Sequence, residues 1–223
     1  MGKDPKGVFA EGCWRALMAI SQATMFERLL TQKFYKDLLV EQIEHAGFAP
    51  GSSLLEIGCG PGALGALTTP GTFELTGFDA SSAMLRRAGQ RAGKPYSRLI
   101  QGRVPELPFP DASFDGAFCA SLIHLVAAPD VVLQQIERVL RPGATLLIAG
   151  PEPGFTPQAI EHLSQTYKLG AFERGAIRLW SSTKKRLGSD ELQKLMNTTG
   201  FESLDTIQHL GKTMFSLRAT LAK

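Results

Sequence analysis

The chain has 223 residues, of which 43% are hydrophobic and 20% are charged, and its formal net charge is +3. This length suits one elaborated domain rather than two full domains, and this composition excludes a disordered chain. The small and dispersed charge argues against a dedicated nucleic-acid binder.

The three cysteines, Cys13, Cys59 and Cys119, lie far apart and form no CxxC pair. We therefore expect neither disulfides nor a metal site, and we expect a reducing, cytoplasmic environment. Glu11 and Arg15 interrupt any signal-peptide core, and because the sequence has no run of 18 uncharged apolar residues, we expect no membrane span. The sequence makes no prediction of oligomeric state.

Apolar residues recur every three or four positions over residues 9–46, which predicts one long or two shorter amphipathic helices. Gly47 and Gly51 then end the helix and open a turn. We expect residues 1–48 to form an N-terminal helical cap.

Strand and helix signals alternate over residues 52–150. The expected strands are residues 53–57, 73–78, 97–101, 114–120 and 145–149, and the expected helices are residues 81–92 and 129–140. Strands that alternate with helices predict a doubly wound, mostly parallel α/β sheet.

The spacing loosens after residue 150. The expected elements are a helix over 156–169, an ambiguous stretch over 171–188, a helix opened by Ser189 as its N-cap, and two strands of an antiparallel hairpin over 203–209 and 214–221. The sheet would then have seven strands. We expect an insertion over residues 151–188 and a C-terminal helix and hairpin over residues 189–223, all within a single domain.

Four glycines, Gly58, Gly60, Gly62 and Gly65, follow the first expected strand closely. In a strand-to-helix turn, glycines let the backbone approach a ligand and adopt positive φ, and the N-terminus of the next helix offers free N–H groups to an anion. The pattern also satisfies GxGxxG, so at this point a nicotinamide or flavin fold, or a turn without a ligand, stays open.

Asp79 ends the second expected strand, 79 − 62 = 17 residues after Gly62. A carboxylate at this place can accept both hydroxyls of an adenosine ribose. A helix N-cap is the alternative role, and the two roles are compatible.

Five motifs occur in order: LLEIGCGPG (54–62), GFDAS (77–81), ELPFPDASFD (106–115), the loop around His124, and VLRPG (139–143). Over roughly residues 52–154 the chain resembles the class I S-adenosylmethionine-dependent methyltransferases. It is most similar to the small-molecule group that includes the ubiquinone and menaquinone C-methyltransferases. The resemblance implies a Rossmann-like fold, S-adenosylmethionine as cofactor, and methyl transfer to a small molecule.

The resemblance also implies roles for individual residues. Glu56 would help to hold the cofactor's ammonium, often through water, and Asp79 would bind the ribose. The remaining implied cofactor residues are Gly58, Cys59, Gly60 and Gly62 beneath the methionine part, Ala80 and Met84 on the adenine, Arg103 and Val104 at the adenine edge, and Ala120.

Arg103 departs from the family pattern, in which an Asp commonly accepts a hydrogen bond from the adenine amino group. Arginine can only donate, so its side chain cannot replace that contact. The backbone N–H of Val104 can still reach a ring nitrogen.

His124 lies at the carboxyl end of the fourth expected strand, where ligands bind in open α/β sheets. It could act as a catalytic base for an acceptor that must lose a proton. A packing or loop-anchoring histidine is the alternative.

The acceptor pocket is expected between the N-terminal helices and the insertion. Aromatic and methionine side chains suit a lipophilic or planar acceptor, although each is also compatible with core packing. The candidates are Trp14, Met18, Met25 and Phe26 on one side, with Phe155, Tyr167, Phe172 and Trp180 on the other.

An NAD(P)-dependent oxidoreductase is the main rival. A short-chain dehydrogenase would need Tyr-x-x-x-Lys, and Leu39, Ile100 and Ala171 stand four positions after the three tyrosines. A non-catalytic S-adenosylmethionine-binding protein is the second rival. A nucleic-acid methyltransferase would need an Asn/Asp-Pro-Pro-Tyr/Phe motif after the fourth strand, where the chain has ASLI (120–123). We therefore expect no nucleic-acid partner.

Overall fold

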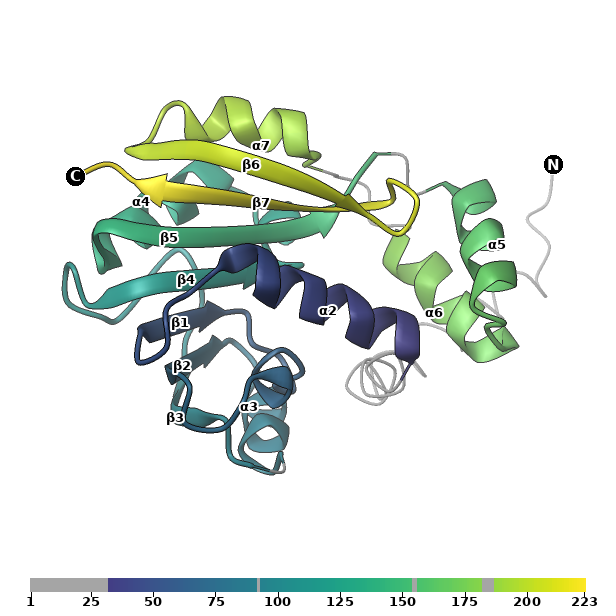
Figure 1. Ribbon diagram of the computed structural model, residues 1–223, viewed down its shortest axis with the longest axis horizontal. Coiled ribbons are helices and arrows are strands. Elements are labelled where there is room, and N and C mark those ends of the chain that lie inside the picture. Colours follow the sequence, from purple (N-terminus) through teal and green to yellow (C-terminus); the bar gives the residue numbers. More distant parts are fainter. Residues whose placement is uncertain (1–31, 92, 154–155, 182–186) are drawn as a thin grey trace, which may run out of the picture.

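The computed structural model describes residues 32–91, 93–153, 156–181 and 187–223 (Figure 1). Its centre is a seven-stranded sheet in the order β3-β2-β1-β4-β5-β7-β6. The strands are β1 (Ser53–Ile57), β2 (Glu74–Asp79), β3 (Tyr96–Gln101), β4 (Phe114–Ala120), β5 (Leu140–Pro151), β6 (Phe201–His209) and β7 (Met214–Leu221). The helices are α2 (Lys33–Ala46), α3 (Ser82–Gly89), α4 (Pro129–Val139), α5 (Pro157–Thr166), α6 (Ala171–Ser181) and α7 (Ser189–Met196).

The first five strands pair in parallel, and β7 runs antiparallel between β5 and β6. The predicted fold class, a mostly parallel Rossmann-like sheet with a C-terminal antiparallel hairpin, is confirmed. The strand order reverses between β1 and β4, which pair with each other at the centre of the sheet. In open α/β sheets such a reversal leaves a crevice at the carboxyl ends of the strands.

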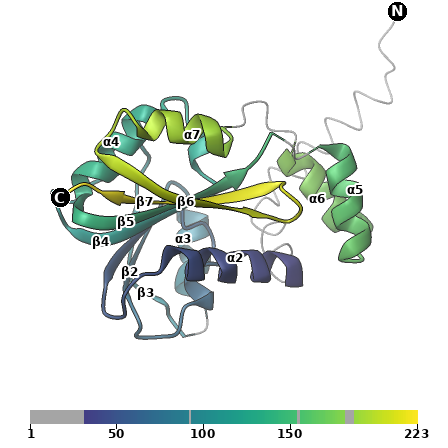
Figure 2. The same cartoon turned by 45° about the horizontal axis from the view of Figure 1, so that its top comes forward.

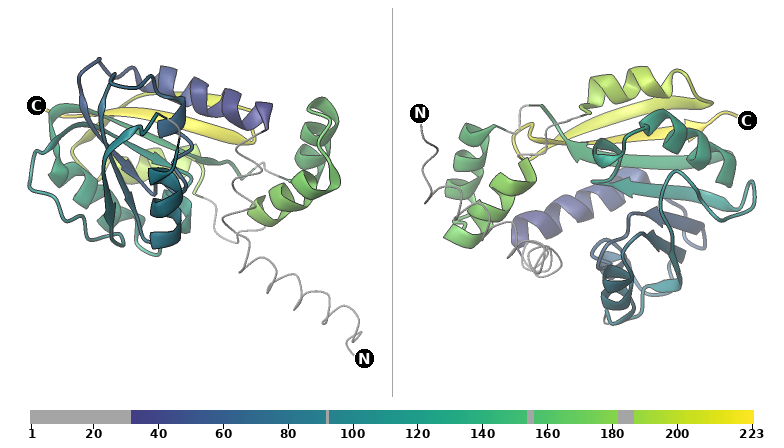
Figure 3. Two further views of the ribbon diagram at one scale, coloured as in Figure 1. Left: turned by 90° about the horizontal axis from the view of Figure 1, so that it is seen from below. Right: turned by 180° about the vertical axis from the view of Figure 1, so that it is seen from behind.

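Helices cover both faces of the sheet, α2 on one face and α4 with α7 on the other (Figure 3). Side chains of a strand alternate between faces, so Leu54 packs into the core beneath α2 and its neighbour Leu55 into the core beneath α4 and α7. Both leucines are fully buried. These two cores hold the strand ends that carry the candidate site in place.

The helices α5 and α6 lie side by side beyond the carboxyl end of β5, at the right of Figure 1 and again in Figure 2. Ile160 and Leu163 of α5 and Ile177 of α6 belong to the same core as α2. This pair of helices therefore extends the α2 side of the molecule past the strand ends.

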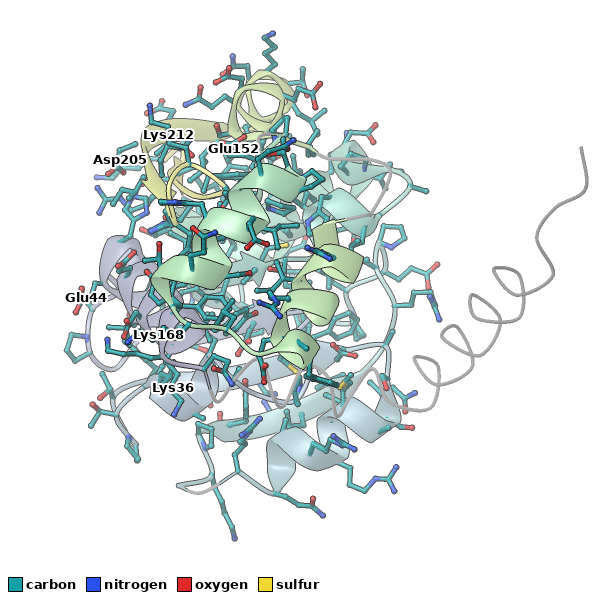
Figure 4. All side chains as sticks on the ribbon, turned by 90° about the vertical axis from the view of Figure 1, so that its right-hand side faces the viewer. Lys36, Glu44, Glu152, Lys168, Asp205 and Lys212 are labelled. Atoms are coloured by element: carbon teal, nitrogen blue, oxygen red, sulfur yellow. The ribbon has the colours of Figure 1, made fainter. Side chains whose placement is uncertain are left out.

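A buried polar network fixes α2 to the C-terminal hairpin. The Ser216 hydroxyl on β7 hydrogen-bonds His45 Nδ1 at 2.7 Å and His209 Nε2 at 2.8 Å. The other nitrogen of His209 lies 2.7 Å from Glu41 Oε2, and His45 Nε2 lies 3.0 Å from Asp205 Oδ2, although out of line for a good hydrogen bond. Asp205 projects from the hairpin on the side of α2 (Figure 4).

Several predicted boundaries are confirmed, and others are wrong for local reasons. β4 and β7 match their predicted ranges, and α2 ends at Gly47, whose φ is +64°. β5 begins at Leu140 because the Arg-Pro-Gly stretch joins the strand instead of forming a separate turn. The ambiguous stretch contains α6, and the N-cap of α7 is Gly188 rather than Ser189.

The helix predicted to follow the glycine cluster is absent from the described structure. A single 3-10 turn, η1 (Gly65–Leu67), follows instead. The glycines and Pro61 disfavour a regular helix there, so no α-helix N-terminus faces a ligand at this loop. The predicted helices before residue 32 lie outside the described residues, and no helix in the described ranges is long and apolar enough to cross a membrane.

Candidate functional site

The loop after β1 adopts a conformation that favours glycine. Gly58, Gly60 and Gly62 have φ values of +75°, +51° and +76°. The amides of Gly58 and Cys59 both donate to the carbonyl of Phe78, at 2.7 and 3.1 Å, and so tie the loop to the end of β2. Glycine is required because other residues are strained at such angles.

The glycines of this loop face different neighbours. A Cβ at Gly58 would lie 3.2 Å from Leu122, in the loop after β4, so the loops of the two central strands meet here. A Cβ at Gly60 would meet nothing within 4 Å, whereas one at Gly62 would lie 3.0 Å from Ala88 on α3. Gly60 therefore faces open space, and Gly62 packs on a helix.

The Asp79 carboxylate is held by backbone amides on both oxygens. Oδ2 accepts from Gly60 N at 2.9 Å, and Oδ1 accepts from Ser81 N at 2.8 Å. The N-cap of α3 is Ser81, whose hydroxyl accepts from Met84 N. Each oxygen of Asp79 has a second acceptor position, so the fixed carboxylate can receive two further hydrogen bonds.

A cavity of about 380 Å³ lies beside this carboxylate at the ends of β1, β2 and β4. Its size falls in the range of small-molecule pockets. Apolar side chains form much of its wall, and Asp79 forms part of its polar side. The lining residues are Gly58, Phe78, Asp79, Ala80, Gly102, Arg103, Val104, Leu122, Leu125, Val126 and Ala127.

The cavity brings together Gly58, Asp79, Ala80, Arg103 and Val104 from the predicted cofactor residues. The other predicted residues lie outside its lining: Glu56, Cys59, Gly60, Gly62, Met84 and Ala120. Met84 and Ala120 are half-buried, and Cys59 is buried, which raises the pKa of its thiol. The Cys59 side chain is therefore a thiol at neutral pH.

Glu56 is a buried carboxyl at the end of β1, with only 4% of its surface exposed. The Tyr96 hydroxyl donates a hydrogen bond to Glu56 Oε2 at 2.6 Å. Burial raises the pKa of Glu56 to about 8, so the free protein carries this carboxyl mostly in its neutral form at pH 7. The sequence singles out Glu56 but not Tyr96, because their contact spans 40 positions.

His124 lies in the 3-10 turn η2 (Ile123–Leu125), directly after β4, and is buried. Neither ring nitrogen has a hydrogen-bond partner within the described residues. Burial lowers its pKa to about 4, so the ring is neutral at pH 7. A buried imidazole without a partner is unusual, and it is suited to accept a hydrogen bond or a proton from a bound molecule.

Part of the predicted acceptor surface lies within the described structure. Tyr167 follows α5, is 38% exposed, and has its ring 5.5 Å from that of Phe34 on α2. Phe172 packs against the core beneath α2, and the backbone of Trp180 lies in α6. Trp14, Met18, Met25, Phe26 and Phe155 lie outside the described residues.

Glu152 is a buried polar residue after β5 that sequence reasoning missed. Glu152, which is labelled in Figure 4, accepts hydrogen bonds from Ser189 N, Ser189 Oγ and Gln208 Nε2. It thus joins β5 to α7 and β6. Its position just after a strand is a signal that could have identified it. Within the described ranges, no group of three or more His, Cys, Asp or Glu residues is arranged to hold a metal ion.

Comparison with known proteins agrees with this geometry. Residues 55–148 match the family described as "Methyltransferase domain". A "2-phytyl-1,4-naphtoquinone methyltransferase" of Synechococcus elongatus is 34% identical over 125 residues, which are 53% of each chain. A "Demethylmenaquinone methyltransferase" of Symbiobacterium thermophilum is 27% identical over 74% of each chain. Over these residues the chain is similar to S-adenosylmethionine-dependent methyltransferases.

The fold of the chain is also found in solved structures. A structure described as a SAM-dependent methyltransferase, possible histamine N-methyltransferase, from Thermotoga maritima superimposes with a TM-score of 0.65. It is 21% identical, and the match covers 87% of this chain and 93% of that one. The chain spans about half the length of the first curated relatives that it matches.

Proposed function

We propose that the protein transfers the methyl group of S-adenosylmethionine to a small, lipophilic or planar organic acceptor. The observation that carries the proposal is the cavity at the reversal of strand order, where a positive-φ glycine loop, a fixed carboxylate and apolar walls meet. An adenosine needs these groups: an acceptor for its ribose hydroxyls and an apolar slot for its base.

The residues around the cavity fit S-adenosylmethionine. Asp79 would accept hydrogen bonds from the ribose, because both of its oxygens are oriented and retain acceptor capacity. Ala80 and Val104 would border the adenine, with the Val104 N–H as a donor. Arg103 is exposed at the cavity wall and would offer the base donors only.

The loop from Gly58 to Gly60 would pass beneath the methionine part, because a Cβ at Gly60 would point into open space. Glu56 would hold the ammonium, directly or through water. Ala120, at the end of β4, and Met84, in the first turn of α3, lie outside the cavity lining and would pack beside the cofactor at its margin.

The bound cofactor supplies a methyl group on a positive sulfonium, so the leaving group needs no acid and the protein mainly aligns the two reactants. His124 would accept the proton of an acceptor that must lose one, since it is neutral and unpartnered at the end of β4. Its low pKa makes it a weak base and favours acceptors that are already acidic.

The acceptor would bind between α2 and the α5–α6 pair, where Tyr167 and Phe34 meet. Trp14, Met18, Met25 and Trp180 are the further candidates to line it. Two relatives are named for naphthoquinone and demethylmenaquinone substrates, which supports a bicyclic or lipophilic acceptor.

Calorimetric titration with S-adenosylmethionine, S-adenosylhomocysteine and NAD tests the cofactor. We expect the first two to bind, and Asp79→Ala to weaken both by roughly 10- to 100-fold, because a hydrogen-bonded charged group is removed. Asp190→Ala, at an exposed carboxylate on α7, is the matched control and should bind normally. Binding of NAD alone would contradict the proposal.

A mass-spectrometric assay tests the acceptor class. The panel would include a lipophilic naphthoquinol, a simple phenol, a fatty acid and a hydrophilic amine, each incubated with S-adenosylmethionine. We expect an added methyl group on the lipophilic or planar compounds. Methylation of the hydrophilic amine alone would refute a lipophilic acceptor while leaving methyl transfer intact.

A further inference from the structure

Tyr96 reaches from the edge of the sheet to its centre. It opens β3, the outermost strand on this side, and its ring lies beneath the glycine loop. A Cβ at Gly65 would lie 2.6 Å from Cζ of this ring, and Cβ atoms at Gly62 and Gly77 would lie 3.0 Å from it. Real Cβ atoms scarcely ever approach other atoms more closely than 3.0 Å, so these three glycines form a slot for the tyrosine.

The slot positions the Tyr96 hydroxyl beside the Glu56 carboxyl. The hydroxyl proton is donated to Glu56 Oε2 at 2.6 Å. Burial, together with the nearby Glu56, raises the pKa of Tyr96, which therefore remains a donor at every physiological pH.

Glu56 faces groups that cannot neutralise a negative charge. These are Asp79 from β2, Cys59 from the loop, Tyr35 from α2 and Tyr96 from β3. Among the described residues, no lysine, arginine or histidine forms an ion pair with it. A buried carboxyl in such surroundings must hold a proton or meet a cation.

We propose that Tyr96 is a positioning residue that aims the Glu56 carboxyl at the cofactor's ammonium, and that this carboxyl gives up its proton to solvent when the ammonium arrives. The inference rests on the proposed function and adds to it a role for Tyr96 and the release of one proton on cofactor binding. One O–H bond of the Glu56 carboxyl breaks, the proton leaves to buffer, and the carboxylate keeps the Tyr96 hydrogen bond while pairing with the ammonium.

The test compares two ligands that differ only in the relevant group. S-adenosylhomocysteine carries the aminoacyl tail, and 5′-methylthioadenosine carries the same nucleoside and a thioether without it. Titrations at about pH 7 in two buffers of different ionisation enthalpy give the protons released on binding. At this pH the ligand's own amine is still mostly protonated.

In the wild type we expect S-adenosylhomocysteine to release close to one proton and 5′-methylthioadenosine to release none. Tyr96→Phe should weaken S-adenosylhomocysteine binding by roughly 10- to 100-fold, because a hydrogen bond to a charged group is lost. It should leave 5′-methylthioadenosine binding unchanged. Ser97→Ala, which removes a hydroxyl bond from β3 to β2 at the next position, is the matched control and should match the wild type for both ligands.

Glu56→Gln is the second variant, and it keeps a side-chain oxygen for Tyr96. It should abolish proton release and weaken only S-adenosylhomocysteine. Equal weakening of both ligands by Tyr96→Phe, or wild-type binding without proton release, would overturn the inference while leaving the proposed cofactor intact. Failure of the wild type to bind either ligand would overturn both.

Discussion

His124 and Glu56 are buried near the ends of the two central strands, and burial moves their pKa values in opposite directions. Both groups are neutral in the folded chain at pH 7. The folded state therefore disfavours a proton on His124 and favours one on Glu56, relative to the unfolded chain.

His124 should make the protein less stable in acid. Its pKa is lowered from 6.5 to about 4, so its contribution is complete above pH 6.5 and is lost as the pH falls toward 4. The loss amounts to about 3 kcal/mol at most. The difference in unfolding free energy between wild type and His124→Leu, measured by urea titration, should shrink by this amount across that range. A constant difference would show that the imidazole is solvated.

Glu56 should make the protein less stable in base. Its pKa is raised from 4.5 to about 8, so its contribution is complete below pH 4.5 and is lost as the pH rises toward 8. Between pH 6.5 and 8, where His124 of the folded chain stays neutral, the protein without cofactor should lose about 2 kcal/mol. Glu56→Gln should remove this decline in the same urea titrations. If the variant declines equally, another group is responsible.

At the scale of elements, the glycine loop serves two purposes. Gly58 lines the cavity and Gly60 faces open space, whereas Gly62 and Gly65 make room for α3 and Tyr96. The four glycines therefore respond differently to the same substitution.

Gly65→Ala should destabilise the fold, and Gly60→Ala should mainly weaken cofactor binding. The added methyl at Gly65 meets the Tyr96 ring and should cost about 1–3 kcal/mol, whereas the one at Gly60 meets nothing and should cost about 1 kcal/mol for its backbone angle. Thermal unfolding and calorimetry measure the two effects. In a double-mutant cycle, Tyr96→Ala should recover part of the Gly65→Ala loss. Additive losses would exclude the steric contact.

Ser216→Ala should loosen α2 from the hairpin. The hydroxyl hydrogen-bonds two buried histidine nitrogens, so its removal leaves both nitrogens without a partner. The unfolding free energy should fall by about 2–4 kcal/mol. Urea unfolding measures this cost. Ser113→Ala, which removes an exposed hydroxyl bond, is the control and should change stability by less than about 0.5 kcal/mol. A similar small change for Ser216→Ala would indicate that water replaces the hydroxyl.

At the scale of the whole molecule, periodicity and turn residues were enough to predict the alternating architecture, and the motifs located Asp79 and the glycine loop on it. Alternation predicts local elements because each strand and helix carries its own pattern. The contact between Tyr96 and Glu56 depends instead on how β3 aligns with β2. Leu75 pairs with Tyr96 but Thr76 pairs with Arg98, and this shift cannot be derived from either strand alone.

The missing helix after the glycine loop has a similar cause. In such folds a strand is commonly followed by a glycine turn and then a helix. Here the four glycines and Pro61 leave only a 3-10 turn before β2. The acceptor side stays a prediction, because Trp14, Phe26 and Phe155 lie outside the described residues, while Tyr167 contacts Phe34 on α2.

The slot for Tyr96 connects an outer strand with the interior of the sheet. Edge strands usually open more readily than central ones, and their amide hydrogens exchange with solvent sooner. Since Tyr96 anchors β3 through Glu56, a ligand that fixes Glu56 should slow amide exchange along β3, on the far side of the sheet from α5 and α6. Opening of β3 would in turn free the Glu56 carboxyl from Tyr96. The rate at which β3 opens would therefore limit how long the cofactor stays bound.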